Sequence, residues 1–319
     1  MGLKQTTTIN QAAKLLQSAS SIALFAHTNP DGDTIGSCLG LKLSLEKLGK
    51  KVAVFCDSEM NARLSVFEQT KSISRQFYGK YDLSVAVDCS DVERIGELSA
   101  VFYSARETMT IDHHGGDYFS KYNCLYDYAS CCQIVFEIAK ELSVPIDDEI
   151  ATYFYMGLCT DTGNFAHNNT NSDCFYMAGE LSKLGADIER VYRVFFRDTS
   201  LSETKLLARA LSHLRSYYGD RMFLTYITAS DLSEFGLDPS STSGIVSYTI
   251  DIDTAKVGVC ICEVTPCHFK VSMRGKGFSV RNVCREFGGG GHELAAGCRI
   301  DGFLEDVIDK IVRTVGFSL

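Results

Sequence analysis

Several features that mark special classes of protein are scarce in this sequence of 319 residues. It has only 4 prolines and 26 glycines, which excludes collagen-like and proline-rich chains. No internal repeat or low-complexity segment is apparent, and no apolar run approaches the roughly 20 residues that span a bilayer. The first residues, MGLKQTTTIN, lack the apolar core of a secretory signal peptide. We therefore expect a cytoplasmic globular protein that makes no membrane contact.

Positive charge is also in short supply. The 31 Lys and Arg residues face 40 Asp and Glu, which leaves a net charge of −9 and a pI of about 5.3. Proteins that coat duplex nucleic acid usually show the opposite balance, so a long duplex is not the expected partner, whereas a short anionic substrate fits. The acidic excess lies within residues 1–189. This division favours metal binding in the first part and anion binding in the second, although ordinary surface variation explains it equally well.

The 13 cysteines form no CxxC pair, and their number is odd. Most of them stand in apolar runs such as VAVFC and VGVCIC. Residues in such runs are buried, so we expect reduced thiols in a reducing compartment. Hydrophobic residues make up 45% of the chain, enough for a core that needs no disulfide.

Apolar runs alternate with helical periodicity in the first part of the chain. Strand-like runs lie at 21–27, 51–56, 83–89 and 108–112, and helical patterns at 10–19, 34–49, 131–143 and 148–160. This alternation predicts an α/β domain with a parallel sheet and helices on both faces. In such sheets, ligands bind beyond the carboxyl ends of the strands.

A helical stretch and a second α/β pattern follow. The helical stretch covers about 172–217, strand-like runs lie at 222–228, 256–264, 268–274 and 294–300, and helical patterns at 279–287 and 303–315. The sequence therefore predicts an α/β domain over 1–189, a helical connector over 190–218 and a smaller α/β domain over 219–319.

The first strand runs directly into the segment HTNPDGD at residues 27–33. His27, Asp31 and Asp33 supply one imidazole and two carboxylates within seven residues. Ions such as Mn²⁺ accept this mixture of ligands, and the Pro and Gly between them permit a tight turn. An Asp-rich turn that caps a helix would explain the segment equally well if it stood alone.

Two further strand-like runs also end in candidate ligands. Asp88 follows LSVAV, and TMTI runs into Asp112, His113 and His114. Parallel strands present their carboxyl ends at one edge of a sheet. Buried unpaired carboxylates are costly, and a shared cation compensates them. The three strand ends together therefore predict a metal centre.

A third candidate, Asp161, lies in GLCTDTGNF at residues 157–165. The tripeptide DTG also occurs in aspartic proteases, but those enzymes need two such carboxylates that share a proton. This chain has one DTG and an α/β pattern, so a metal ligand at the end of a helix fits better.

A glycine-rich segment, FGGGGHELAAG, covers residues 287–297. Its glycines could offer backbone N–H groups to an anion, and His292 could add a donor. Arg274, Arg281 and Arg285 lie nearby in the sequence, which favours a phosphate. A flexible loop is the alternative explanation of such a run.

Together the four motifs resemble the DHH phosphoesterase superfamily, whose name corresponds to Asp112, His113 and His114 here. The glycine-rich segment resembles the family's C-terminal DHHA-type domain, and the whole looks most like the two-domain bacterial branch of nanoRNases and pAp phosphatases. The resemblance implies two divalent ions, Mn²⁺ or alternatively Mg²⁺, that share Asp88. It implies the metal ligands His27, Asp31, Asp33, Asp88, His113 and Asp161, catalytic roles for Asp88 and His114, and substrate contacts by Arg274, Gly289, Gly290, Gly291 and His292.

The resemblance also implies an activity. It points to two-metal hydrolysis of short oligoribonucleotides, of 3′-phosphoadenosine 5′-phosphate (pAp), or of both. A phosphodiesterase for cyclic di-AMP or pApA, and a non-catalytic nucleotide sensor, stay open as alternatives. Inorganic pyrophosphatases of the superfamily share the N-terminal motifs but lack the GGGGH loop, which argues against them. The expected partner is a short RNA or small nucleotide, and a homodimer stays open.

Overall fold

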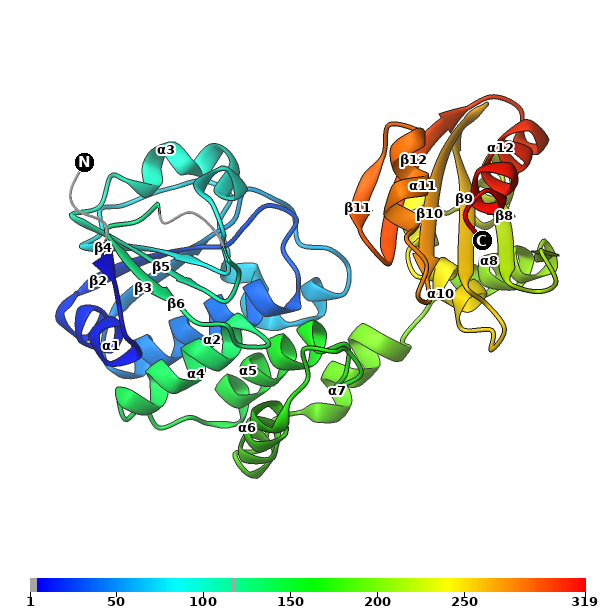
Figure 1. The fold of residues 1–319 in the computed structure, drawn as a ribbon. Helices are drawn as coiled ribbons and strands as arrows, with labels where there is room; N and C mark the ends of the chain where they lie inside the picture. The colour runs from blue at the N-terminus through cyan, green and yellow to red at the C-terminus, as the bar shows by residue number, and fades with distance from the viewer. Residues whose placement is uncertain (1–4, 116–118) are drawn as a thin grey trace. The chain divides into compact units, whose positions relative to one another are not determined.

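A computed structural model describes residues 5–115 and 119–319 (Figure 1). The chain divides into two compact units, Met1–Asp198 and Thr199–Leu319. The boundary falls within residues 190–218, for which the sequence predicts a connector, and α8 (Leu201–Ser212) belongs to the second unit. Within the described residues, no helix combines the length and the apolar character needed to cross a membrane.

The first unit is built on a parallel sheet of six strands in the order β1-β6-β5-β4-β2-β3. The strands are β1 (Gln5–Thr6), β2 (Ser21–Phe25), β3 (Lys51–Phe55), β4 (Leu83–Val87), β5 (Glu107–Asp112) and β6 (Tyr122–Leu125). The predicted parallel α/β sheet is confirmed. The sequence patterns do not reveal β1 and β6, because both strands are short and contain polar residues.

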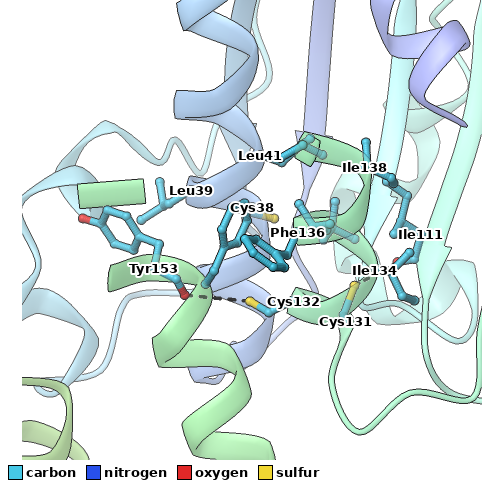
Figure 2. Close-up of a cluster of buried hydrophobic side chains, with 14 of the residues drawn as sticks. Cys38, Leu39, Leu41, Ile111, Cys131, Cys132, Ile134, Phe136, Ile138 and Tyr153 are labelled. Carbon is cyan, nitrogen blue, oxygen red and sulfur yellow. Dashed lines mark hydrogen bonds between the residues drawn. The ribbon is translucent and has the colours of Figure 1, made fainter. Parts of the chain in front are cut away.

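The two faces of this sheet bury different side chains. In β2, Ile22 and Leu24 join the larger core, whereas Ala23 and Phe25 join a smaller one on the other face. Figure 1 shows the helices of the larger core on one side of the sheet. Figure 2 shows part of that core, where Cys131 and Cys132 lie among apolar side chains. The larger core contains α1 (Ile9–Ser18), α2 (Gly32–Lys47), α4 (Cys131–Glu141) and α5 (Asp148–Asp161), and the smaller one η3 (Val92–Leu98) and α3 (Ser99–Phe102).

Glycines allow α2 and α5 to pack very closely. Gly32, Gly36 and Gly40 recur every four residues and therefore share one face of α2. A Cβ on Gly36 would lie 2.5 Å from the carbonyl oxygen of Tyr153, and a Cβ on Gly32 would lie 2.5 Å from the side chain of Thr160. This contact holds the start of α2 against the end of α5, which are the two helix ends that carry Asp33 and Asp161.

The helical stretch predicted over 172–217 is interrupted in the structure. It consists of α6 (Ser172–Lys183), α7 (Ile188–Tyr192), the π-helical segment η4 (Arg193–Arg197), α8 and the short strand β7 (Arg215–Tyr217). Gly185 takes a left-handed conformation with φ of 91° just beyond α6, and Ser200 begins α8 as an N-cap. These local signals break a pattern that looks continuous in its apolar spacing.

The second unit has a smaller mixed sheet in the order β11-β12-β10-β9-β8-β7. Its strands are β7, β8 (Met222–Ile227), β9 (Val257–Thr265), β10 (His268–Gly275), β11 (Gly290–His292) and β12 (Ala295–Asp301). Strands β8 and β9 pair in parallel, and the other neighbours pair antiparallel. Its helices are α8, α9 (Ala229–Phe235), α10 (Ile245–Ile250), α11 (Val280–Glu286) and α12 (Leu304–Gly316). The predicted smaller α/β domain is confirmed.

Candidate metal centre

Three parallel strands of the first unit bring their candidate residues to one edge of the sheet. His27 lies two residues beyond β2, Asp88 follows β4 directly, and Asp112 is the last residue of β5. Strand β4 pairs with both β2 and β5, so the three ends are neighbours. Asp88 has a left-handed backbone conformation with φ of 58°, which is uncommon for a residue other than glycine. The chain therefore turns sharply at the point where the Asp88 carboxylate enters the site.

One triad consists of His27, Asp31 and Asp88. The Nε2 atom of His27 lies 3.8 Å from Asp31 Oδ2 and 3.7 Å from Asp88 Oδ2. The Nδ1 atom of His27 lies 2.8 Å from the carbonyl oxygen of Thr28 and must donate to it, which leaves Nε2 as the free donor of an electron pair. Asp31 also caps α2 by accepting the N–H groups of Asp33 and Thr34. Capping and metal binding are therefore compatible at Asp31.

A second triad consists of Asp33, His113 and Asp161. The Nε2 atom of His113 lies 3.7 Å from Asp33 Oδ2 and 3.2 Å from Asp161 Oδ2. Its Nδ1 atom lies 3.0 Å from the carbonyl oxygen of Tyr128, so the ring is oriented in the same way as that of His27. The structure thus brings together all six of the residues for which metal binding is predicted, as two groups of three.

Asp88 connects the two triads. Its Oδ2 atom belongs to the first triad and accepts a hydrogen bond of 2.6 Å from the Thr34 hydroxyl, while its Oδ1 atom lies 3.5 Å from His113 Nε2. Asp88 Oδ1 and His113 Nε2 are both buried and neither makes a well-formed hydrogen bond. Buried polar atoms without partners are rare, and a cation between them would satisfy both. This set of carboxylate oxygens and imidazole nitrogens therefore fits divalent metal ions.

Asp33 is the most enclosed carboxylate of the site, with a residue exposure of 0%. It accepts hydrogen bonds of 2.6 Å from the N–H of Cys131 and 3.0 Å from that of Cys132, at the start of α4. A helix N-terminus favours a negative charge. Burial nevertheless raises the pKa of Asp33, and the nearby carboxylates of Asp88 and Asp161 raise it further. The metal-free site is therefore short of positive charge.

The two histidines of the DHH motif supply part of that positive charge. Burial lowers the pKa of His113, but the close carboxylates of Asp161 and Asp88 outweigh it and raise the pKa to about 11. Burial opposes ionisation of Asp88, yet contacts with His113, His114 and Thr34 hold its pKa well below the usual range. Metal ligands must be deprotonated, so cation binding would displace a proton from His113.

Asp112 holds His114 at the rim of the site. Asp112 Oδ1 lies 2.9 Å from His114 Nδ1 and also accepts the backbone N–H groups of His113 and His114. The hydrogen bond with Asp112 is the main reason why the pKa of His114 rises to about 9. The sequence places Asp112 at a strand end among the candidate ligands, and its buried positioning role becomes visible in the structure. The same is true of Thr34 and of the N–H groups that bind Asp33.

The residues predicted to contact substrate lie in the second unit. Arg274 is half-buried near the end of β10, where its guanidinium donates to the carbonyl of Met273 at 3.0 Å. The N–H groups of Gly288 and Gly289 donate to carbonyls of the last turn of α11, so they are not free for an anion. A Cβ on Gly289 would lie 2.3 Å from the carbonyl oxygen of Gly297, which gives this glycine a packing role. Contacts through Gly290, Gly291 and His292, which form β11, stay predictions.

Fold and site together define the class of protein. Residues 21–158 match the DHH family, N-terminal domain, and residues 219–316 match the DHHA1 domain. The chain therefore carries a DHH domain followed by a DHHA1 domain. The resemblance seen in the sequence is confirmed.

Relatives of known name share nearly the whole length. The chain is 26% identical over 319 residues to the bifunctional oligoribonuclease and PAP phosphatase NrnA of Mycoplasma genitalium, with 97% of this chain and 98% of that protein covered. It is 29% identical over 303 residues to the protein of the same name from Thermus thermophilus, with 92% and 89% covered. A crystal structure of an exopolyphosphatase-related protein from Bacteroides fragilis superposes with a TM-score of 0.86 at 26% identity, covering 97% of this chain and 95% of that one.

Proposed function

We propose that this protein is a metal-dependent phosphoesterase that hydrolyses short oligoribonucleotides and pAp. The observation that carries the proposal is the grouping of six side chains into two triads joined by Asp88. The relatives named as oligoribonucleases and PAP phosphatases support the choice of substrates, because they match both domains of the chain.

The two triads would hold two divalent cations. His27 and Asp31 would bind one ion, Asp33, His113 and Asp161 the other, and Asp88 would contribute one oxygen to each. Carboxylate and imidazole donors suit Mn²⁺, with Mg²⁺ as the alternative. When bound, such a pair supplies Lewis acidity toward the phosphoryl oxygens and an acidic water near the phosphorus.

The chain's own residues orient these ligands and handle the leaving group. The carbonyls of Thr28 and Tyr128 fix the two ligand imidazoles, each with Nε2 toward the carboxylates. The side chain of His114 is 45% exposed and its Nδ1 is occupied by Asp112. Its Nε2 therefore remains available to contact the scissile phosphate and to give a proton to the departing oxygen. Arg274, Gly290, Gly291 and His292 complete the proposal as substrate contacts of the second domain.

A substrate panel tests this proposal. The purified full chain is incubated with pAp, RNAs of two to five nucleotides, pApA, cyclic di-AMP or pyrophosphate, each with Mn²⁺, Mg²⁺ or a chelator. We expect AMP and phosphate from pAp and mononucleotides from the RNAs, with both reactions abolished by the chelator. Turnover of cyclic di-AMP or pApA alone would establish the alternative phosphodiesterase. Two bound ions with no turnover of any compound would overturn the proposal in favour of a nucleotide sensor.

A further inference from the structure

The segment of residues 128–132 in the first unit supports two ligands of the second triad. The carbonyl of Tyr128 accepts from His113 Nδ1 at 3.0 Å, and two N–H groups at the start of α4 donate to Asp33 at 2.6 and 3.0 Å. The third ligand, Asp161, lies on a different element, at the end of α5. A cation bound by all three ligands needs them at one fixed spacing. The connection between this segment and the end of α5 therefore matters for the triad.

The side chain of Asn169 joins the 128–132 segment to the end of α5. Its Nδ2 atom donates to the carbonyl oxygen of Ala129 at 3.1 Å and to the carbonyl oxygen of Asp161 at 3.2 Å. Carbonyl oxygens can only accept, so the amide group makes these two contacts in one orientation, with one hydrogen for each. Ala129 is buried inside the segment. One amide group therefore links the backbone that supports two ligands to the backbone of the third.

The loop that brings Asn169 back to α5 has an uncommon backbone. Gly163, Asn164 and Phe165 all have left-handed conformations, with φ of 54°, 55° and 64°. This conformation is costly for residues other than glycine, so contacts made by the loop must compensate the cost. Strained backbone of this kind clusters at functional sites. Here it returns the chain to the end of α5, where carbonyl oxygens lack partners within the helix and Asn169 can donate to one of them.

A second side chain of the same loop, His167, makes only one of the two contacts. Its Nδ1 atom donates to the carbonyl oxygen of Asp161 at 3.1 Å, and a Cβ on Gly163 would lie 2.2 Å from its Nε2. In the described part of the chain, none of the hydrogen bonds of His167 involves Ala129. A comparison of His167 with Asn169 therefore separates the capping of α5 from the connection between the two supports.

We propose that Asn169 is a positioning residue that sets the affinity of the second triad for its cation. It acts through the backbone, because it fixes the spacing between Asp161 and the 128–132 segment. The first triad is oriented by other groups, the carbonyl of Thr28 and the hydroxyl of Thr34. Loss of the bridge should therefore weaken the binding of one ion and leave the other unchanged. This role rests on the proposed function, because it concerns the proposed metal ions.

Calorimetric titration of the full chain with Mn²⁺ tests the role of Asn169. Two background variants isolate the ions: Asp31→Asn removes a ligand of the first triad and can still cap α2, whereas Asp161→Asn removes a ligand of the second. In the Asp31→Asn background, we expect Asn169→Ala to raise Kd of the remaining ion about tenfold, as the loss of groups that support metal ligands does. In the Asp161→Asn background, Asn169→Ala should leave Kd of the first-triad ion unchanged.

An isosteric variant and a matched control sharpen the test. Asn169→Asp keeps the shape of the side chain but removes both donors. It should weaken the second-triad ion as Asn169→Ala does, although it adds a negative charge near a cation site. His167→Ala removes the other side chain that donates to the Asp161 carbonyl and should leave both Kd values as in the parent background.

The possible outcomes separate this role from the proposed function. An unchanged Kd in Asn169→Ala, an equal loss for both ions, an equal loss in His167→Ala, or tighter binding in Asn169→Asp would each overturn the role of Asn169, while the two-ion site stands. A wild-type chain that binds no Mn²⁺ would instead overturn the proposed function, and the role of Asn169 with it.

Discussion

Single residues of the candidate metal centre are held in position by the protein itself. Both ligand imidazoles are anchored through Nδ1 to backbone carbonyls, and Asp33 is anchored by the two N–H groups that begin α4. The Thr34 hydroxyl anchors Asp88. Such supporting contacts set the orientation and basicity of metal ligands. The residues therefore need little rearrangement to receive cations. Asp88 Oδ1 and His113 Nε2 are buried without a hydrogen-bond partner, so a cation between them would satisfy both atoms.

The variant Asp88→Asn tests the shared ligand. We expect it to retain fewer than two ions per chain and to lose at least about 100-fold in kcat, because changes even to residues that only support a metal ligand cost 10- to 100-fold. Metal content is measured by elemental analysis after desalting, and kcat with pAp. The control Asp127→Asn removes an exposed carboxylate of the same unit and should behave as wild type. Two tightly bound ions and near-normal turnover in Asp88→Asn would contradict the assignment.

The variant His114→Ala separates catalysis from metal binding. We expect kcat to fall by about 10²- to 10⁴-fold, the usual contribution of a positioned acid or base. Metal content should stay at two ions, because Nδ1 of His114 is already engaged by Asp112. His167→Ala is the control, since His167 is exposed and its Nδ1 lies 3.1 Å from the carbonyl oxygen, not the carboxylate, of Asp161. A loss of bound metal in His114→Ala would make His114 a ligand and contradict its proposed role.

At the scale of elements, the close contact of α2 with α5 positions the two helix ends that carry Asp33 and Asp161. The variant Gly36→Ala would place a Cβ 2.5 Å from a backbone carbonyl oxygen and 3.0 Å from the backbone nitrogen of Gly157. Backbone atoms cannot move aside as a flexible side chain can. We therefore expect a loss of about 1–3 kcal/mol in the free energy of unfolding, as for other overpacked cores. Urea denaturation followed by circular dichroism measures it.

The variant Gly179→Ala provides the matched control within a helix. Gly179 lies in α6, is exposed, and a Cβ added there would meet no atom within 4 Å. Replacing glycine by alanine inside an exposed helix stabilises it by up to about 1 kcal/mol. The two variants should therefore shift the unfolding midpoint in opposite directions. A stabilising effect of Gly36→Ala would show that α2 and α5 are not in close contact.

Elements with a clear local sequence pattern are predicted, whereas elements that form through contacts with distant parts of the chain are not. Long apolar runs such as LSVAV indicate buried strands, so the sequence predicts β2, β3, β4 and β5 and places Asp88 and Asp112 at strand ends. Strand β1, with only Gln5 and Thr6, has no such pattern and forms because β6 pairs with it. Likewise, caps and a left-handed glycine interrupt the helical stretch that apolar spacing alone makes continuous.

The candidate metal centre also contains contacts that the sequence does not predict. Parallel strand order predicts that His27, Asp88 and Asp112 gather at one edge. No pattern in the sequence predicts that the N–H groups of Cys131 and Cys132, nearly a hundred residues further along the chain, bind Asp33. That contact depends on where α4 packs. The glycine-rich run suggests free N–H groups for an anion. In the structure, however, the N–H groups of Gly288 and Gly289 donate to carbonyls at the end of α11.

At the scale of the whole molecule, the two units have separate hydrophobic cores. The cores of the first unit lie on the two faces of the parallel sheet and contain no residue of the second unit. The cores of the second unit form around the mixed sheet. All of the candidate metal ligands belong to the first unit. A ligand that binds only the folded first unit should therefore stabilise that unit selectively.

Calorimetry of the full chain should consequently show two unfolding transitions, of which Mn²⁺ raises only one. At a free concentration of 100 times Kd, binding of an ion adds about 2.7 kcal/mol, which for a unit of this size corresponds to roughly 5–10 °C. Gly36→Ala identifies the transition of the first unit, because every atom that the added Cβ would crowd belongs to that unit. The transition lowered by Gly36→Ala should be the one raised by Mn²⁺, and Asp88→Asn should reduce the rise. If Mn²⁺ raised the other transition, the cation would bind outside the two triads and the site assigned to the first unit would be wrong.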